Sequence, residues 1–89
     1  MTVVETNRFL KDVRDLLSES EAIRLVSFIG ANPQAGDVVP ETGGVRKLRW
    51  SLPGRGKRGG ARVIYYLRTA TDILAGRLRE EGKGQLEQS

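Results

Sequence analysis

The chain contains no cysteine and no histidine among its 89 residues. Without cysteine it has no disulfide, no thiol nucleophile and no thiolate metal site, and without histidine it lacks the commonest general base and metal ligand. No apolar run approaches the roughly 20 residues of a membrane-spanning helix, and the N-terminus lacks the basic-then-apolar order of a signal peptide. We therefore expect a cytoplasmic protein without metal, cofactor or membrane partner.

A long stretch also lacks acidic residues, from Thr42 to Thr71. It holds eight of the fifteen cations, so the formal charge is −3 over residues 1–41, +8 over 42–71 and −1 over 72–89, in agreement with the net +4. The eight cations are Arg46, Lys47, Arg49, Arg55, Lys57, Arg58, Arg62 and Arg68. Such local basicity predicts a site for a polyanion. Charge alone does not distinguish it from a basic surface that keeps the protein soluble.

The first third of the chain predicts a short strand and two helices. Two adjacent valines favour a strand over residues 2–5. Apolar residues at helical spacing then predict a helix from about Asn7 to Leu17. Ser18 and Glu21 have the spacing of a capping box, in which each side chain accepts a hydrogen bond from the other residue's backbone N–H at a helix start. A second helix should follow and end near Pro33, because proline cannot continue it. The two helices would form a hairpin.

The middle of the chain predicts a connecting loop over 34–44 and two antiparallel strands over 45–50 and 61–68. Strand alternation places apolar residues on one face and cations on the other, and we interpret Trp50 and Tyr65 as core residues. The glycine-rich segment between the strands has neither the strand-to-helix context nor the spacing of a P-loop. Helices packed on one face of a small antiparallel sheet, an α+β fold, satisfy both patterns. The open face should display Lys47, Arg49, Arg62 and Tyr66.

A cationic strand pair with an aromatic nearby suits nucleic acid, because cations bind phosphates and rings stack on bases. RNA is the better candidate. In RNA cleavage the 2′-hydroxyl attacks the adjacent phosphate. An enzyme must then take a proton from the nucleophile, neutralise the oxyanion and protonate the leaving oxygen. Lys47 is the candidate base, and Arg49 and Arg62 are the candidate phosphate and oxyanion ligands. The candidate RNA-binding residues are Arg46, Arg55, Lys57, Arg58, Tyr66 and Arg68.

Three segments, GDVVPETGGVRKLRW, PGRGKRGG and ARVIYYLR, resemble the RelE/HigB family of type II toxin–antitoxin toxins, most closely its HigB-like branch. The resemblance implies a ribosome-dependent mRNA endonuclease that inhibits translation. It also implies a neutralising antitoxin, expected to be of the helix-turn-helix type. Lys47 and Arg49 match the family's basic strand pair and Arg62 its phosphate-binding arginine. The cations of the loop, Arg55, Lys57 and Arg58, would grip RNA or ribosome.

The C-terminal segment departs from that family. Members continue into a further central strand and a YAK-like segment with another catalytic cation, whereas residues 72–81 predict a weak amphipathic helix around Ile73, Leu74 and Leu78. We therefore expect a toxin domain over 1–71, an atypical tail over 72–89, and the last strand missing or altered. Reading residues 72–88 one nucleotide later, with suitable codons, gives TSWLAVYAKKEKDNLSR. We hypothesise that the tail is a frameshift product.

These departures predict a ribonuclease of reduced activity. The alternative from a different class is a non-catalytic, truncated homologue that retains antitoxin or RNA binding. Gyrase poisoning, as in the related ParE toxins, is disfavoured because the strand cations match the ribonuclease branch, although related folds do not guarantee one target.

Overall fold

The computed structural model describes residues 1–52 and 60–81. The elements are β1 (Thr2–Glu5), α1 (Asn7–Leu16), α2 (Glu19–Ala31), β2 (Asp37–Val38), β3 (Val45–Ser51), β4 (Gly60–Leu67) and β5 (Asp72–Glu81). The predicted α+β class is confirmed, and the two predicted helices and the strands β1, β3 and β4 lie within one or two residues of their expected bounds.

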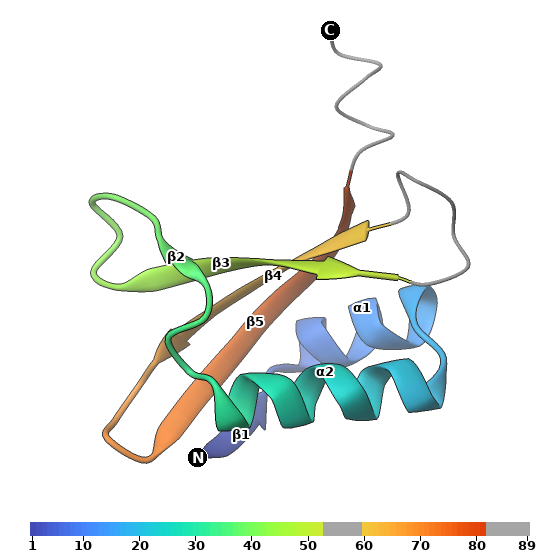
Figure 1. The fold of residues 1–89 in the computed structure, drawn as a ribbon, viewed down its shortest axis with the longest axis horizontal. Coiled ribbons are helices and arrows are strands. Elements are labelled where there is room, and N and C mark those ends of the chain that lie inside the picture. The colour runs from blue at the N-terminus through green and yellow to red at the C-terminus, as the bar shows by residue number, and fades with distance from the viewer. Residues whose placement is uncertain (53–59, 82–89) are drawn as a thin grey trace, which may run out of the picture.

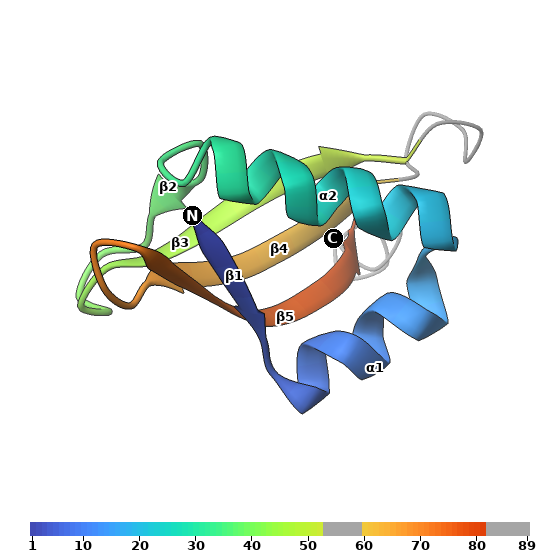
Figure 2. The same cartoon turned by 90° about the horizontal axis from the view of Figure 1, so that it is seen from below.

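The strands form one sheet in the order β1-β5-β4-β3-β2 (Figure 1). β1 runs parallel to β5, and every other neighbouring pair is antiparallel. Both helices lie on one side of this sheet, with α2 across its face and α1 alongside β5 (Figure 2). The opposite face therefore carries no helix from the described part of the chain.

The core lies between the helices and the sheet. Phe9 of α1 and Leu25 and Ile29 of α2 are fully buried, and so are Val63, Tyr65, Ile73, Ala75 and Leu78 of the strands beneath them. Each buried aliphatic or aromatic side chain of this size stabilises the fold by roughly 1.5–3 kcal/mol relative to exposure. Trp50 is half-buried and packs against Phe28, with ring centroids 5.2 Å apart. The prediction that Tyr65 is a core residue is confirmed, and Trp50 packs at the margin of this core.

Local capping fixes where the helices begin. The Ser18 hydroxyl accepts a hydrogen bond from Glu21 N–H, and the Glu21 carboxylate accepts one from Ser18 N–H at 2.8 Å. This capping box confirms the prediction for α2. The hydroxyl of Thr6 caps α1 in the same way by accepting the N–H of Phe9. The end of β1 and the start of α1 therefore meet at a single residue.

The prediction of a helix over residues 72–81 is wrong, because this segment forms the central strand β5. Its pairing with β4 shifts register between Ile64 and Tyr65, which leaves Gly76 as an extra residue in a β-bulge. The buried residues are therefore Ile73, Ala75 and Leu78, spaced by two and then by three. That interrupted alternation hides the strand period in the sequence. Because β5 is present, the expectation of a missing last strand is wrong as well. The hypothesis of a frameshift at this point rested partly on a missing last strand, and that support is lost.

The segment over 34–44 is a loop except at β2, which was not predicted. Asp37 and Val38 pair with Lys47 and Arg46 of β3. Two residues are too few to establish an alternation of apolar and polar side chains, so the sequence could not reveal this strand. The turn that follows has positive φ angles at Glu41, Gly43 and Gly44.

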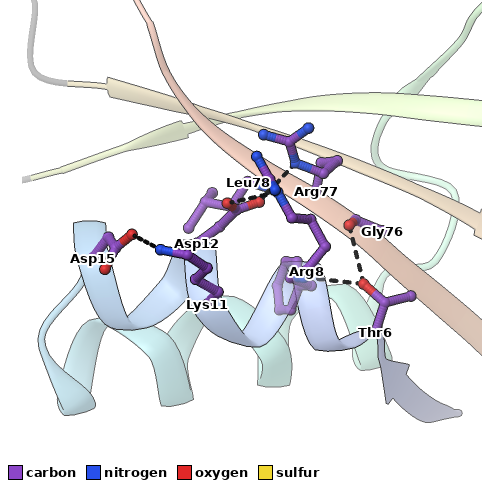
Figure 3. A network of polar contacts seen from close by, with 9 residues as sticks. Thr6, Arg8, Lys11, Asp12, Asp15, Gly76, Arg77 and Leu78 are labelled. Atoms are coloured by element: carbon purple, nitrogen blue, oxygen red, sulfur yellow. Dashed lines mark hydrogen bonds and ion pairs between the residues drawn. The ribbon is translucent and has the colours of Figure 1, made fainter.

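Side chains from α1 and its N-cap hold the bulged half of β5, because β1 pairs with β5 only as far as Ala75. The Asp12 carboxylate accepts the Leu78 N–H at 3.0 Å and the Arg77 Nε–H at 2.9 Å, both on Oδ2 (Figure 3). The Thr6 hydroxyl donates to the Gly76 carbonyl at 3.1 Å. α1 thus covers a sheet edge that would otherwise be open. In the described ranges, no helix has the length and apolar character that crossing a membrane requires.

Candidate nucleic-acid interface

The three predicted catalytic residues lie on the open face of the sheet. Arg49 of β3 stands directly opposite Arg62 of β4, and Lys47 stands opposite Ile64. Side chains alternate along a strand, so Lys47 and Arg49 share one face, and directly opposite residues face the same way. Val63 and Tyr65, which flank Ile64, point into the core. The cations therefore point away from the helices.

These three side chains line one pocket of about 470 Å³ together with Ala35, Asp37 and Leu48. The Nε atom of Arg62 is buried. The structure thus brings together Lys47, Arg49 and Arg62. Three cations around one depression suit a phosphate, because guanidinium groups bind its oxygens through paired N–H donors.

The sequence interpretation missed two residues of this region. Arg79 of β5 is directly opposite Arg62, so Arg49, Arg62 and Arg79 form a row across three strands. Asp37 of β2 is opposite Lys47 and brings a carboxylate to the pocket wall. Arg79 was not identified from the sequence because its strand was interpreted as a helix. Asp37 was not identified because its strand has only two residues.

The row of arginines, defined as Arg49, Arg62 and Arg79, has an electrostatic cost. Like charges directly opposite each other on neighbouring strands destabilise a sheet by a few tenths to about 1 kcal/mol for each pair. A polyanion lying across the row would relieve that repulsion.

Arg46 lies on the other face of β3, opposite the buried Tyr65. Its Nη1 donates to the Gly36 carbonyl at 2.7 Å and to the Gln34 carbonyl at 3.3 Å. The Tyr65 hydroxyl accepts the Gly36 N–H and donates to the Pro33 carbonyl. Arg46 and Tyr65 together fix the loop before β2, which places Asp37 beside Lys47. Arg46 thus lies on the face opposite to that of Lys47 and Arg49.

Tyr66 and Arg68 lie toward the far end of β4. Tyr66 is four residues from Arg62, or about 13 Å along an extended strand, and its neighbours across the sheet are the apolar Val45 and Leu74. Arg68 is exposed in the turn to β5 and forms an ion pair with Asp72 at 3.3 Å. Neither residue reaches the pocket. The predicted loop residues Arg55, Lys57 and Arg58 lie outside the described residues.

Within residues 1–52 and 60–81, no group of three or more acidic side chains is placed to hold a metal ion. The chemistry available at the pocket is therefore that of one amine, two guanidinium groups and the nearby carboxylate of Asp37. A search of the chain against protein-family models finds no match.

Proposed function

We propose that this chain is a toxin-type endoribonuclease that binds mRNA across the open face of its sheet and inhibits translation in the cytoplasm. One observation carries the proposal: Lys47, Arg49 and Arg62 surround a single pocket, although they are up to fifteen positions apart in the chain. The chain's resemblance to RelE/HigB toxins supports the same assignment. It also favours a ribosome as the place of cleavage and a helix-turn-helix antitoxin as the neutralising partner.

Each of these residues has a separate role in the proposed cleavage. Lys47 takes the proton from the 2′-hydroxyl while the 2′-oxygen attacks the adjacent phosphorus atom. Arg49 and Arg62 stabilise the charge on the phosphoryl oxygens, and Arg79 extends the grip along the strand of phosphates. The bond to the 5′-oxygen breaks, which leaves a 2′,3′-cyclic phosphate and a 5′-hydroxyl. The leaving oxygen takes its proton from a cation or from water.

That last step limits the rate, because the chain has no histidine to act as general acid. The YAK-like segment that supplies a further cation in the resembled family is also absent from the sequence. We therefore expect slow cleavage. The same observation favours a second candidate function, a non-catalytic protein that binds RNA or an antitoxin with the same surface.

A ribosome-dependent mRNA cleavage assay tests the proposal. The double variant Lys47→Ala, Arg62→Ala removes the base and one phosphate ligand, so cleavage should fall by at least about 100-fold. The matched control is Lys11→Ala, Arg14→Ala, which removes one lysine and one arginine from exposed positions of α1. Its cleavage should equal that of the parent.

Binding of the same mRNA, followed by fluorescence anisotropy, separates the two candidate functions. RNA binding that the Lys47/Arg62 variant weakens, without cleavage by the parent, would support the non-catalytic function. Cleavage that is the same in the parent and in the Lys47/Arg62 variant would contradict the catalytic assignment.

A further inference from the structure

Among the described residues, only half of the outer edge of β3 is covered by another strand. β2 pairs with Arg46 and Lys47, and Val39 N–H donates to the Val45 carbonyl at 2.8 Å just beyond that pairing. No strand from residues 1–52 or 60–81 lies beside positions 48–51 on that side. Main-chain groups alternate in direction along an antiparallel strand, so those of Ser51 point to the same side as those of Val45. This half of β3 is a template for one more strand.

An apolar groove runs beside that half-edge, between α2 and β3. One part, of about 560 Å³, is lined by Ile23, Arg24, Ser27, Phe28, Trp50 and Ser51. A second part, of about 270 Å³, shares Phe28, Trp50 and Ser51 and adds Leu48 and Arg49. The shared residues join the two parts into one groove. Ile23 at its rim is 60% exposed, the most of any large apolar side chain in the described part of the chain.

The lining of the groove carries charge of one sign. Arg24 and Arg49 contribute cations, and none of the acidic side chains that the structure describes lines either part. A fitting partner supplies apolar side chains for the groove, main-chain groups for the strand edge and negative charge beside Arg24. An extended peptide that adds a strand meets all three requirements, because its main chain pairs with the edge and its alternate side chains enter the groove.

We propose that the groove and the half-edge of β3 bind an extended peptide segment in which apolar and acidic residues alternate. Successive side chains of an added strand point to opposite faces of the sheet. Every second residue would enter the groove beside Trp50 and Phe28, and the residues between them would point to the open face, where Lys47 and Arg49 lie. This inference does not depend on the proposed ribonuclease activity, since it needs only the edge, the groove and their charge.

The sole tryptophan of the chain, Trp50, reports binding directly through its fluorescence. The probe is the blocked peptide Glu-Val-Glu-Leu-Glu-Val-Glu, titrated into the full chain. The control peptide has the same composition with its four glutamates grouped at one end, so it keeps the charge and loses the alternation. We expect saturable binding of the alternating peptide and at least about tenfold weaker binding of the grouped peptide, because the latter cannot bury its apolar residues on one side.

Two protein variants test the two halves of the site. Ile23→Glu places a like charge at the rim, and Ser51→Pro removes a main-chain donor on the open side of an edge strand, where proline is tolerated. Each variant should weaken binding of the alternating peptide by about tenfold or more. The loss of an apolar contact or of a strand pairing costs binding free energy of that order. Leu10→Glu, at an exposed apolar position of α1, and Ser51→Ala are the matched controls and should bind as the parent does.

Equal binding of the two peptides, or unchanged binding by both Ile23→Glu and Ser51→Pro, would overturn the proposal. Light scattering tests the remaining occupant, a second copy of this chain paired edge to edge. A dimer that Ser51→Pro converts to a monomer, in a protein that binds no peptide, would also overturn it.

Discussion

Asp12 is the buried carboxylate in the described part of the chain, with 9% of the residue exposed. Burial alone would raise its pKa. The hydrogen bonds from Leu78 N–H and Arg77, together with the charges of Arg77 and Arg8, outweigh burial and hold the pKa of Asp12 below its ordinary value of 3.8. A lowered pKa means that folding favours the charged form. Asp12 therefore links α1 to β5 as a carboxylate, not as an acid.

Replacement of Asp12 tests this link. Asp12→Ala leaves the Leu78 N–H without its acceptor, so the free energy of unfolding at pH 7 should fall by about 1–3 kcal/mol. Asp12→Asn can still accept that bond and should lose less. The carboxylate stabilises the fold fully above about pH 4, and its contribution is lost as the pH falls through the folded-state pKa. Urea unfolding at pH 7 and pH 3 measures the effect.

The parent and Asp12→Asn should therefore differ less at pH 3 than at pH 7. A difference of the same size at both pH values would contradict the role of the charge. The helical spacing of α1 does not reveal the burial of Asp12, because its partners Arg77 and Leu78 lie 65 and 66 positions away in sequence. Contacts at that separation leave no trace in local periodicity.

Thr6 connects three secondary-structure elements, β1, α1 and β5. Its N–H donates to the Ala75 carbonyl at 3.1 Å, its hydroxyl donates to the Gly76 carbonyl, and that hydroxyl also accepts the first hydrogen bond of α1. The position therefore ends β1, begins α1 and holds the bulge of β5. A single hydroxyl group sets how these elements meet.

Thr6→Val removes that hydroxyl and keeps the shape of the side chain. We expect a loss of about 1–2 kcal/mol in the free energy of unfolding, since both a helix cap and a hydrogen bond to the bulge disappear. Thr6→Ser keeps the hydroxyl and is the matched control, with an expected loss well below that of Thr6→Val. Guanidinium unfolding of the two variants measures the difference. Equal losses would show that the methyl group, not the hydroxyl, matters here.

Elements with a local signal were predictable from the sequence, and the others were not. The capping box of Ser18 and Glu21 lies within four residues, and β3 and β4 alternate without interruption. By contrast, the bulge at Gly76 breaks the alternation of β5, so this strand was not predicted. Arg79 lies on β5 and was therefore missed as well. Lys47, Arg49 and Arg62 could be assigned to one face because their strands are regular. Arg46 was grouped with the other cations by its charge, and its position on the core-side face was not considered.

At the scale of the whole molecule, β5 holds the sheet together, because it alone lies between β1 and β4. A chain that ends at Thr71 would lose Ile73, Ala75 and Leu78 from the core and leave β1 without a partner. We expect such a chain not to fold, as shown by the absence of a cooperative transition on heating in circular dichroism. A chain that ends at Glu81 keeps every contact given above and is the control. Cooperative unfolding of the shorter chain would show that residues 1–71 form a domain by themselves.

The position of β5 also has a consequence for biosynthesis. The hydroxyl of Thr6 and the carbonyl of Gly76 are 70 positions apart, and such distant contacts form late because a long loop must close first. At about 5–20 residues per second, the ribosome delivers the β3–β4 pair before it delivers β5. The row of arginines across three strands therefore does not exist while β3 and β4 are being made, and it is completed only after Arg79 has been synthesised.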